Sequence, residues 1–162
     1  MTTSLSRQSA LDSAIHASGH KLDGPILIGG NYVSVVQDGS LAWVSGQIPR
    51  VGNTVVATGR VGSDVSLSQA QMATQVCVLR ALTLLRQSLG SLDRVAQVLR
   101  VNVFVQCAPD FTQQSEVADA ASNLLQEVLG DAGRHTRTSL GVYQLPKNAA
   151  VEVDMVVRTT AV

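Results

Sequence analysis

Hydrophobic residues recur at helical spacing along two long segments of the chain. The run from Ser66 to Leu89 begins with a serine and a glutamine in capping-box spacing, and Gly90 follows its last apolar position. The segment from Ser115 to Leu129 also keeps its apolar residues on one face until glycines interrupt it. The pattern therefore predicts two long helices. A shorter run from Ser4 to Ser18 has looser helical spacing and predicts an N-terminal helix.

Other segments alternate between apolar and polar residues, as β-strands do. The segment from Leu99 to Gln106 places Leu99 and three valines on one side, which predicts a long strand in the centre of a sheet. The runs Tyr32–Val36 and Leu41–Val44 flank an Asp-Gly turn and predict a β-hairpin. Within the Gly- and Pro-rich stretch that follows, Thr54–Val56 predicts a short edge strand.

The last two predicted strands are separated by a turn cluster at Pro146–Asn148. The first of these strands carries Arg137, and the second carries Glu152 among valines. We expect the two strands to be neighbours, so that an arginine and a glutamate enter an apolar sheet close together. Such a pair can hold a small carboxylate and act on it. The alternatives are a structural salt bridge for Arg137 and a solvent-facing position for Glu152.

After the first helix the predicted order of elements is β-β-α-β-α-β-β, without a repeat. This order favours an α/β (α+β) fold, with a mixed sheet and both long helices packed on one of its faces. We divide the chain into an N-terminal helical extension, residues 1–30, and a main domain, residues 31–162. The other face of the sheet is expected to present a largely apolar set: Val36, Val44, Phe104 and Val156. We expect a second subunit to cover it.

Composition limits the classes of protein to which the chain can belong. Its 162 residues suit a single domain. Twelve basic and twelve acidic residues leave no net charge, which argues against nucleic acid as a partner. The sequence is 45% hydrophobic, yet it contains no uninterrupted apolar run of about 18 residues, and residues 1–7 are polar, unlike a secretory signal. We therefore expect a cytoplasmic protein without a membrane segment.

The cysteines and histidines do not have the spacing of a metal site. Cys77 and Cys107 fall in a predicted helix and at a predicted strand end, and we interpret both as free thiols. His16 and His20 have the spacing of helical metal ligands, but a glycine lies between them and no third ligand is apparent. His135 is a candidate proton donor, or alternatively a turn residue that lends a hydrogen bond.

Three motifs of the chain resemble the RidA/YjgF superfamily of reactive-intermediate (enamine/imine) deaminases, which is also called endoribonuclease L-PSP. They are Tyr32 followed at a fixed distance by the sequence SGQIP from Ser45, the sequence VFVQCAPDF of Val103–Phe111, and the block Arg137–Asp154. The last is the most specific, because its arginine lies nine residues before a proline and its glutamate six residues after it. The resemblance covers Gly30–Arg158.

This resemblance implies a chorismate-mutase-like fold that assembles as a homotrimeric barrel, with three clefts at the subunit interfaces. Arg137 would bind the substrate carboxylate through a two-pronged contact, and Glu152 would position or activate the water that adds to a C=N carbon. No metal or cofactor is needed for that reaction. The other substrate-binding residues would be Tyr32, which closes the pocket, together with Ser45, Gly46, Ser139 and Ser115.

The chain departs from the superfamily pattern at three positions. Ser139 stands where deaminase members usually carry a cysteine, Ser115 replaces an asparagine, and Val44 replaces a threonine. The function implied by the resemblance is hydrolysis of enamine or imine acids to 2-keto acids and ammonia. The departures motivate an alternative, a non-catalytic trimeric module that binds small carboxylates. A third hypothesis, an endoribonuclease, is opposed by the balanced charge and by the absence of a basic-aromatic pattern.

Overall fold

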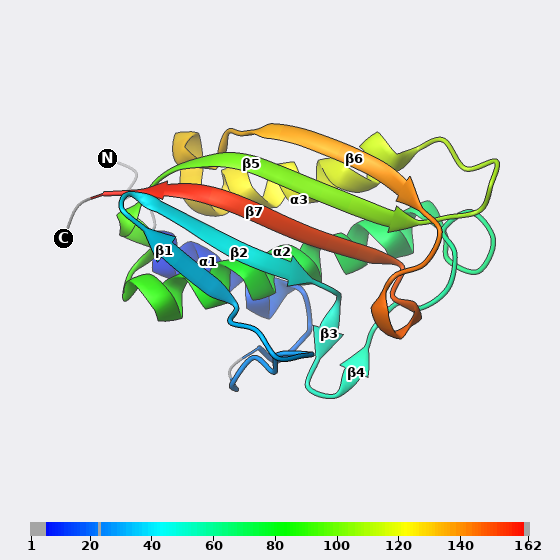
Figure 1. The fold of residues 1–162 in the computed structure, drawn as a ribbon, viewed down its shortest axis with the longest axis horizontal. Coiled ribbons are helices and arrows are strands. Elements are labelled where there is room, and N and C mark those ends of the chain that lie inside the picture. Colours follow the sequence, from blue (N-terminus) through cyan, green and yellow to red (C-terminus); the bar gives the residue numbers. More distant parts are fainter. Residues whose placement is uncertain (1–5, 23, 161–162) are drawn as a thin grey trace.

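The computed structural model describes residues 6–22 and 24–160, which form a five-stranded sheet covered by helices on one face (Figure 1). The order of strands across the sheet is β1-β2-β7-β5-β6. Only β5 and β6 pair in parallel, so the sheet is mixed, as expected. The strands are β1 (Val35–Asp38), β2 (Leu41–Gln47), β5 (Val95–Gln106), β6 (Thr136–Val142) and β7 (Val151–Thr159).

The helices lie behind the sheet in the view of Figure 1, in agreement with the predicted one-sided packing. They are α1 (Arg7–Ala17), α2 (Leu67–Leu89) and α3 (Gln114–Leu129), with short 3-10 turns at Leu92–Arg94, Gly130–Gly133 and Pro146–Asn148. A two-stranded ribbon, β3 (Arg50–Val51) and β4 (Thr54–Val55), projects from one end of the sheet. None of the helices in the described residues is both long and apolar enough to cross a membrane.

The ends of α2 are fixed by the signals read from the sequence. The Ser66 side chain accepts a hydrogen bond from the Gln69 main-chain N–H, and the Gln69 side chain accepts one from the Ser66 main chain. At the other end Gly90 adopts a left-handed conformation with φ of 80°, which a residue without a Cβ reaches at little cost. The predicted capping box and helix stop are both confirmed.

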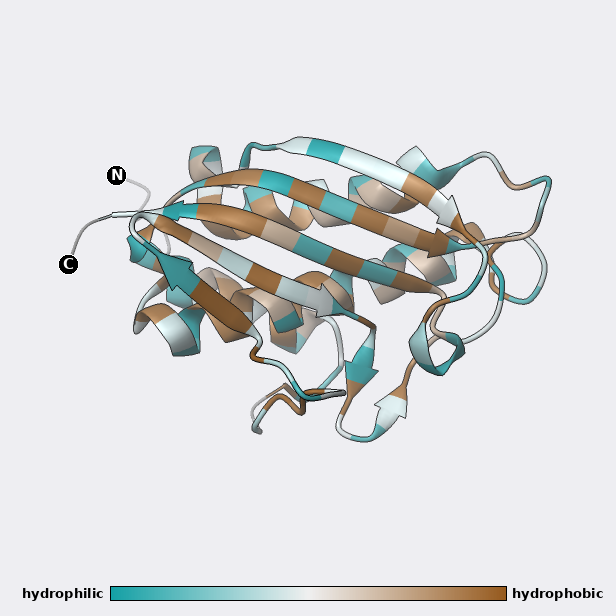
Figure 2. Cartoon of the chain, in the orientation of Figure 1, coloured by the Kyte–Doolittle hydropathy of each residue, from teal (hydrophilic) through white to brown (hydrophobic). Residues whose placement is uncertain are grey.

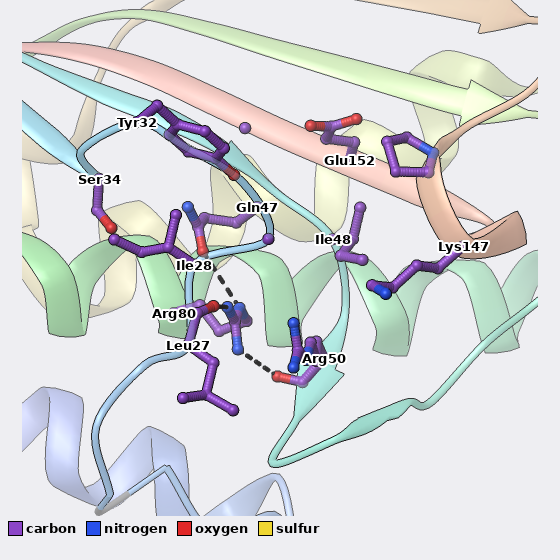
Figure 3. A pocket seen from close by; sticks show the side chains of 13 residues that line it. Leu27, Ile28, Tyr32, Ser34, Gln47, Ile48, Arg50, Arg80, Lys147 and Glu152 are labelled. Atoms are coloured by element: carbon purple, nitrogen blue, oxygen red, sulfur yellow. Dashed lines mark hydrogen bonds between the residues drawn. The ribbon is translucent and has the colours of Figure 1, made fainter.

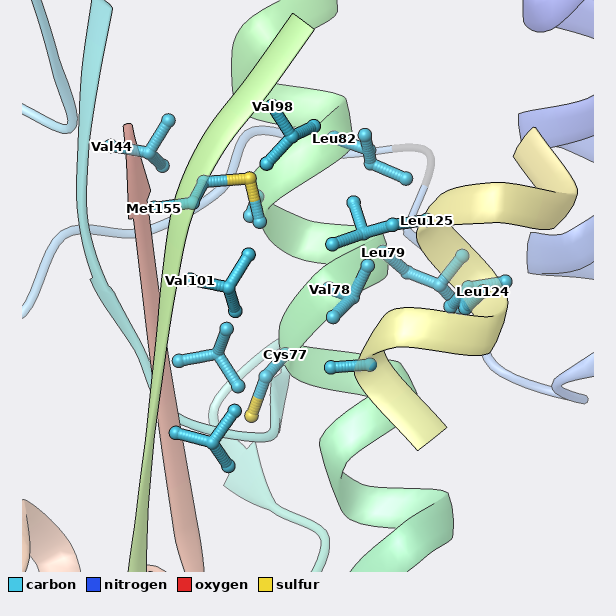
Figure 4. Packing of buried hydrophobic residues seen from close by; sticks show 14 of the residues in the cluster. Val44, Cys77, Val78, Leu79, Leu82, Val98, Val101, Leu124, Leu125 and Met155 are labelled. Carbon is cyan, nitrogen blue, oxygen red and sulfur yellow. The ribbon is translucent and has the colours of Figure 1, made fainter. Parts of the chain in front are cut away.

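The hydrophobic core lies between the sheet and the two long helices (Figure 4). Val101 and Met155 of the central strands face Val78 of α2 and Leu125 of α3, and all four side chains are buried. Along β5 and β7 polar residues alternate with these apolar ones, as the brown and teal bands of Figure 2 show. Alternation with a period of two is what assigns one face of each strand to the core.

The expected adjacency of the strands that carry Arg137 and Glu152 is wrong. The strand β5 lies between β6 and β7 and pairs with both. Burial explains the order: β7 buries alternate residues along its whole length, whereas β6 has no buried residue and occupies an edge, where a polar strand is tolerated. Arg137 and Glu152 are therefore separated by a full strand.

Two residues face differently from the prediction. Val44 was expected on the open face of the sheet but is buried on the helix side, paired with Met155, and its neighbour Trp43 takes the open position. Leu99 was expected beside the core valines but is 36% exposed, because the register of β5 shifts between Val98 and Arg100. A single extra residue reverses the face that a side chain occupies.

The open face of the sheet carries apolar side chains at several exposed positions. Val36 pairs with Trp43, which pairs in turn with Val156, and Phe104 pairs with Leu140. Trp43 is 40% exposed, and Val36 and Leu140 are exposed as well. An apolar sheet face of this kind is a common surface for association between subunits.

Candidate functional site

The predicted site residues fall into two groups on different parts of the chain. Tyr32, Gly46 and Glu152 line one pocket, with Ser45 directly beside Gly46; we call these four residues the glutamate half-site. The residues Ser115, Arg137 and Ser139 lie at the other edge of the sheet, and we call them the arginine half-site.

The pocket of the glutamate half-site has a volume of about 180 Å³ (Figure 3). Its walls come from the segment before β1, the end of β2, the middle of α2 and the Pro146–Asn148 turn. In Figure 3 Tyr32 and Glu152 lie on the upper side, and Arg80 and Arg50 lie below them. The pocket thus lies between Glu152 of the sheet and the arginines Arg50 and Arg80.

A β-bulge in β2 creates the space that Glu152 occupies. Between Val44 and Gln47 the strand β2 advances three residues while β7 advances two. Gly46 lies in this bulge, and a Cβ atom built on it would overlap the Glu152 carboxylate, with the carboxyl carbon only 2.9 Å away. Only glycine at this position allows the glutamate side chain to lie against the backbone of β2.

The carboxylate of Glu152 is available for chemistry. It forms no hydrogen bond or salt bridge within the described residues, although the residue is half-buried. Burial, and secondly the nearby charge of Asp154, raises the pKa of Glu152 above its ordinary value. A carboxyl group with a raised pKa can both accept and return a proton closer to neutral pH.

Tyr32 lines the pocket, and Ser45 is the chain neighbour of the lining residue Gly46. Tyr32 was expected in a strand, but β1 begins at Val35 and Tyr32 lies in the preceding loop, where its ring packs over Gly30. A loop position lets the exposed ring cover the pocket. The Ser45 main-chain N–H donates to Ser34 O at 2.9 Å, and its hydroxyl accepts from the Gln47 side chain at 3.2 Å.

In the arginine half-site the guanidinium of Arg137 is held by groups of α3. Its Nη1 donates to Asp119 Oδ1 and to Ser122 Oγ, both at 2.9 Å. Its Nη2 donates to Ser115 O at 3.3 Å and to Ser115 Oγ at 3.4 Å. Ser139 follows two residues later on the same face of β6, because Arg137 and Ser139 pair with the core residues Val101 and Val103. The structure therefore brings all three predicted residues together.

His135 is linked to Arg137 through a serine. Its Nδ1 donates to Gly133 O at 2.6 Å, which leaves Nε2 to accept from Ser122 Oγ at 2.9 Å, and Ser122 also accepts from Arg137. Burial lowers the pKa of His135. The Gly133 hydrogen bond opposes this effect in part, and the charge of Arg137 adds a smaller lowering. The neutral ring is the form that this arrangement favours.

Within one chain the two half-sites cannot act on the same small molecule. Glu152 pairs with Phe104 on the open face of the sheet, whereas Arg137 pairs with Val101 on the helix face. The strand β5 also lies between them.

Several lining residues were missed at the level of sequence. Arg80, Gln47 and Lys147 all contribute to the pocket wall. The sequence could have indicated Arg80. It lies four residues after Val76 and three before Thr83, on the apolar stripe of a predicted helix, where a charged residue is rare and suggests a specific role. Lys147 gave no such signal, because a turn lysine is ordinarily solvated.

The described residues do not assemble a metal site. Among the residues that the structure describes, no three His, Cys, Asp or Glu side chains lie close enough to hold a metal ion. Cys77 is buried in the core, and burial raises the pKa of its thiol well above the ordinary value. Cys107 is partly buried beside Gln114, whose amide donates to its sulfur at 3.6 Å.

Comparisons with known proteins agree with the fold and the motifs. Residues 12–158 match the sequence model of the family described as "YjgF/chorismate mutase-like, putative endoribonuclease". Protein TCP17 of Trypanosoma cruzi is 43% identical over 140 residues, which cover 86% of this chain and 88% of that protein.

Two solved structures are similar over nearly the whole chain. Atu1372 of Agrobacterium tumefaciens, a protein of unknown function, is 35% identical with a TM-score of 0.85, and the match covers 96% of this chain and 95% of that one. A Shewanella oneidensis protein that bears the same endoribonuclease description is 28% identical with a TM-score of 0.83, over 91% and 98% of the two chains. The chain belongs to the YjgF/chorismate mutase-like family.

Proposed function

We propose that the protein hydrolyses reactive 2-imino and 2-enamino acids to 2-keto acids and ammonia, in clefts formed between subunits of a homotrimer. The observation that carries this proposal is the unpaired carboxylate of Glu152, held in a pocket against Gly46 with a raised pKa. Arg137, oriented by Asp119 and Ser122, supplies a cation of the geometry that binds a carboxylate.

The reaction needs a held water and a path that carries both of its protons to the nitrogen. Glu152 accepts the first proton as the oxygen of water bonds to the imine carbon and the π electrons of the C=N bond move to nitrogen, and it passes this proton to the nitrogen to give a C–NH2 group. Glu152 then takes the hydroxyl proton as the C=O bond of the keto acid forms. It transfers that proton to the amino nitrogen as the C–N bond breaks, and ammonia leaves. No electron is exchanged with a cofactor.

The separation of the half-sites is the argument for assembly. If Arg137 of one subunit faced the Glu152 pocket of the next, the two residues would share a substrate that neither subunit can hold alone. The apolar open face, with Trp43 and Leu140 exposed, supports association through this side of the sheet. Ser115 and Ser139 would enter the same cleft with Arg137.

The test is the loss of freshly generated 2-iminopropionate, with semicarbazide trapping of the remaining imine. Wild type should accelerate the loss, and Arg137→Ala and Glu152→Gln should not. The two inactive variants, co-expressed in equal amounts, should recover about one quarter of the sites, because a cleft is intact whenever each subunit contributes its unaltered residue. No recovery would mean that both residues act within one chain.

A second candidate is a non-catalytic module that binds small carboxylates in the same cleft. Two observations favour the binding module. Ser139 carries a hydroxyl where deaminase members carry a thiol, and Arg137 already forms an ion pair with Asp119. Such a module would give thermal stabilisation of the protein by 2-keto acids without any imine hydrolysis. Ribonuclease activity that co-purifies with wild type and disappears in Glu152→Gln would instead support the family's endoribonuclease name.

A further inference from the structure

Arg80 is the one charged side chain that is buried among the residues described by the structure, with 5% of its surface exposed. It extends from α2 toward the pocket of the glutamate half-site. Its Nε donates to Gln47 Oε1 at 3.2 Å, its Nη1 to Arg50 O at 2.6 Å, and its Nη2 to Leu27 O at 3.4 Å (Figure 3). All three acceptors are neutral oxygens.

A buried cation without a carboxylate partner is unusual, because desolvation of the charge costs several kcal/mol. The arginines Arg86, Arg134 and Arg137 are more exposed, and yet each forms an ion pair with an aspartate. Within the described part of the chain no carboxylate lies within 4.0 Å of Arg80. Burial, together with the nearby charge of Arg50, lowers the pKa of Arg80, as expected for a charge that is not compensated.

The surroundings of Arg80 are suited to an anion. The pocket is lined by three cationic side chains, Arg50, Arg80 and Lys147, against the single carboxylate of Glu152. Its volume of about 180 Å³ exceeds the roughly 150 Å³ at which an engineered cavity takes up benzene, so a short carbon chain fits. Unused N–H groups remain on the guanidinium, since each of its nitrogens makes a single hydrogen bond.

We propose that Arg80 binds a second carboxylate of the substrate, and that the preferred substrates are therefore 2-imino dicarboxylic acids of four or five carbons. In this arrangement one carboxylate lies on Arg137 of a neighbouring subunit, the imine carbon lies beside Glu152, and the far carboxylate reaches Arg80. The inference rests on the proposed function for the imine and for the position of the first carboxylate, whereas the site at Arg80 rests on the contacts above.

The decisive measurement is calorimetric titration with two probes of equal chain length, 2-oxoglutarate and 2-oxopentanoate, which differ only in a terminal carboxylate or methyl group. Wild type should bind 2-oxoglutarate about tenfold to a hundredfold more tightly, the usual range for a charge-assisted hydrogen bond. Arg80→Met should lose this preference and keep its affinity for 2-oxopentanoate. Arg137→Ala should weaken both probes by a similar factor and keep the preference.

A further variant separates binding from a structural role. Arg80→Lys keeps the charge and should keep a reduced preference, so it provides the test if Arg80→Met does not fold. Equal affinities in wild type, or an equal loss of both probes in Arg80→Met, would overturn the inference.

The outcomes also distinguish this inference from the proposed function. Both probes are keto acids, the products of the reaction, so the titration requires no turnover. If the protein prefers 2-oxoglutarate through Arg80 but does not hydrolyse imines, the second carboxylate site is supported and the proposed hydrolase activity is contradicted. Hydrolysis without any preference between the probes would contradict only the role of Arg80.

Discussion

The chemistry that we propose depends on single residues whose surroundings change their charge. Glu152 is the clearest case, because burial and then Asp154 favour its neutral form. A carboxyl group ionises less readily in the folded state than in the unfolded state when its folded-state pKa is raised. Such a group therefore lowers the free energy of unfolding once the pH exceeds its ordinary pKa. The residue would thus be retained for reactivity at some cost to stability.

This cost predicts opposite effects of Glu152→Gln on rate and on stability. Imine hydrolysis should fall by about 10²-fold to 10⁴-fold, the usual contribution of general acid–base catalysis. The melting temperature at pH 7 should be equal to or above that of wild type. A large drop in melting temperature would show that the lost activity reflects unfolding.

Asp154→Asn is the matched substitution on the same strand. It removes the charge that adds to the raised pKa of Glu152 and keeps an oxygen that can accept from Asn102, which donates to Asp154 at 2.7 Å in the native protein. The limb of the pH–rate profile in which activity rises with pH should therefore move to lower pH. An unchanged profile would contradict a catalytic base at Glu152.

His135 gives a prediction about stability and pH. Its folded-state pKa is lowered by burial and by Arg137, so between that value and about 6.5 the unfolded chain binds more protons than the folded one. The contribution of His135 to the free energy of unfolding should fall as the pH drops through this window and should be constant above it. His135→Asn should flatten this dependence in urea titrations, and an unchanged dependence would contradict the lowered pKa.

At the scale of elements, the bulge of β2 creates the space for the glutamate half-site. Without the bulge, β2 would pair with β7 in an unbroken register. A side chain of β2 would then occupy the space in which the Glu152 carboxylate lies. The bulge also directs Gln47 toward Arg80, with which it is hydrogen-bonded. One irregularity therefore positions both a reactive carboxylate and the acceptor of a buried cation.

Gly46→Ala tests the role of this bulge. The added methyl group would overlap the Glu152 carboxylate and displace it, so we expect loss of imine hydrolysis. The free energy of unfolding should change by less than about 1 kcal/mol, because the end of a flexible side chain can move away. Gly24→Ala is the control, because a Cβ built there meets no atom within 4 Å. Activity assays and urea denaturation compare the two variants directly; undiminished hydrolysis by Gly46→Ala would contradict the placement of Glu152 against Gly46.

At the scale of the whole molecule, the proposal requires more than one copy of the chain. The arginine and glutamate half-sites lie on opposite faces of one sheet, and the open face bears exposed Trp43 and Leu140. A surface charge placed on that face would oppose association without disturbing the core on the other side.

Trp43→Lys should accordingly convert the proposed trimer to a monomer and abolish imine hydrolysis, with the folded helix and sheet content preserved. Size-exclusion chromatography with light scattering measures the mass, and circular dichroism measures the fold. Met72→Lys is the control, because Met72 is exposed on α2, away from the sheet. A Trp43→Lys protein that remains trimeric would place the subunit interface elsewhere.

The amino-acid sequence by itself determined which segments form helices and strands and where α2 begins and ends. The capping box at Ser66, the stop at Gly90 and the alternation of β5 are local signals, because helix and strand periods depend on residues that are close in sequence. The same holds for the choice of Arg137 and Glu152, which rests on their spacing within one motif.

Only the tertiary structure decided which segments lie beside one another. That β5 separates the strands of Arg137 and Glu152, that a bulge turns Leu99 outward, and that Arg80 reaches the pocket all depend on pairing across the sheet. Strand order is set by which faces find burial, and this is a property of the assembled core rather than of any single segment. For that reason the candidate residues could be named from the sequence, whereas their division into two half-sites could not.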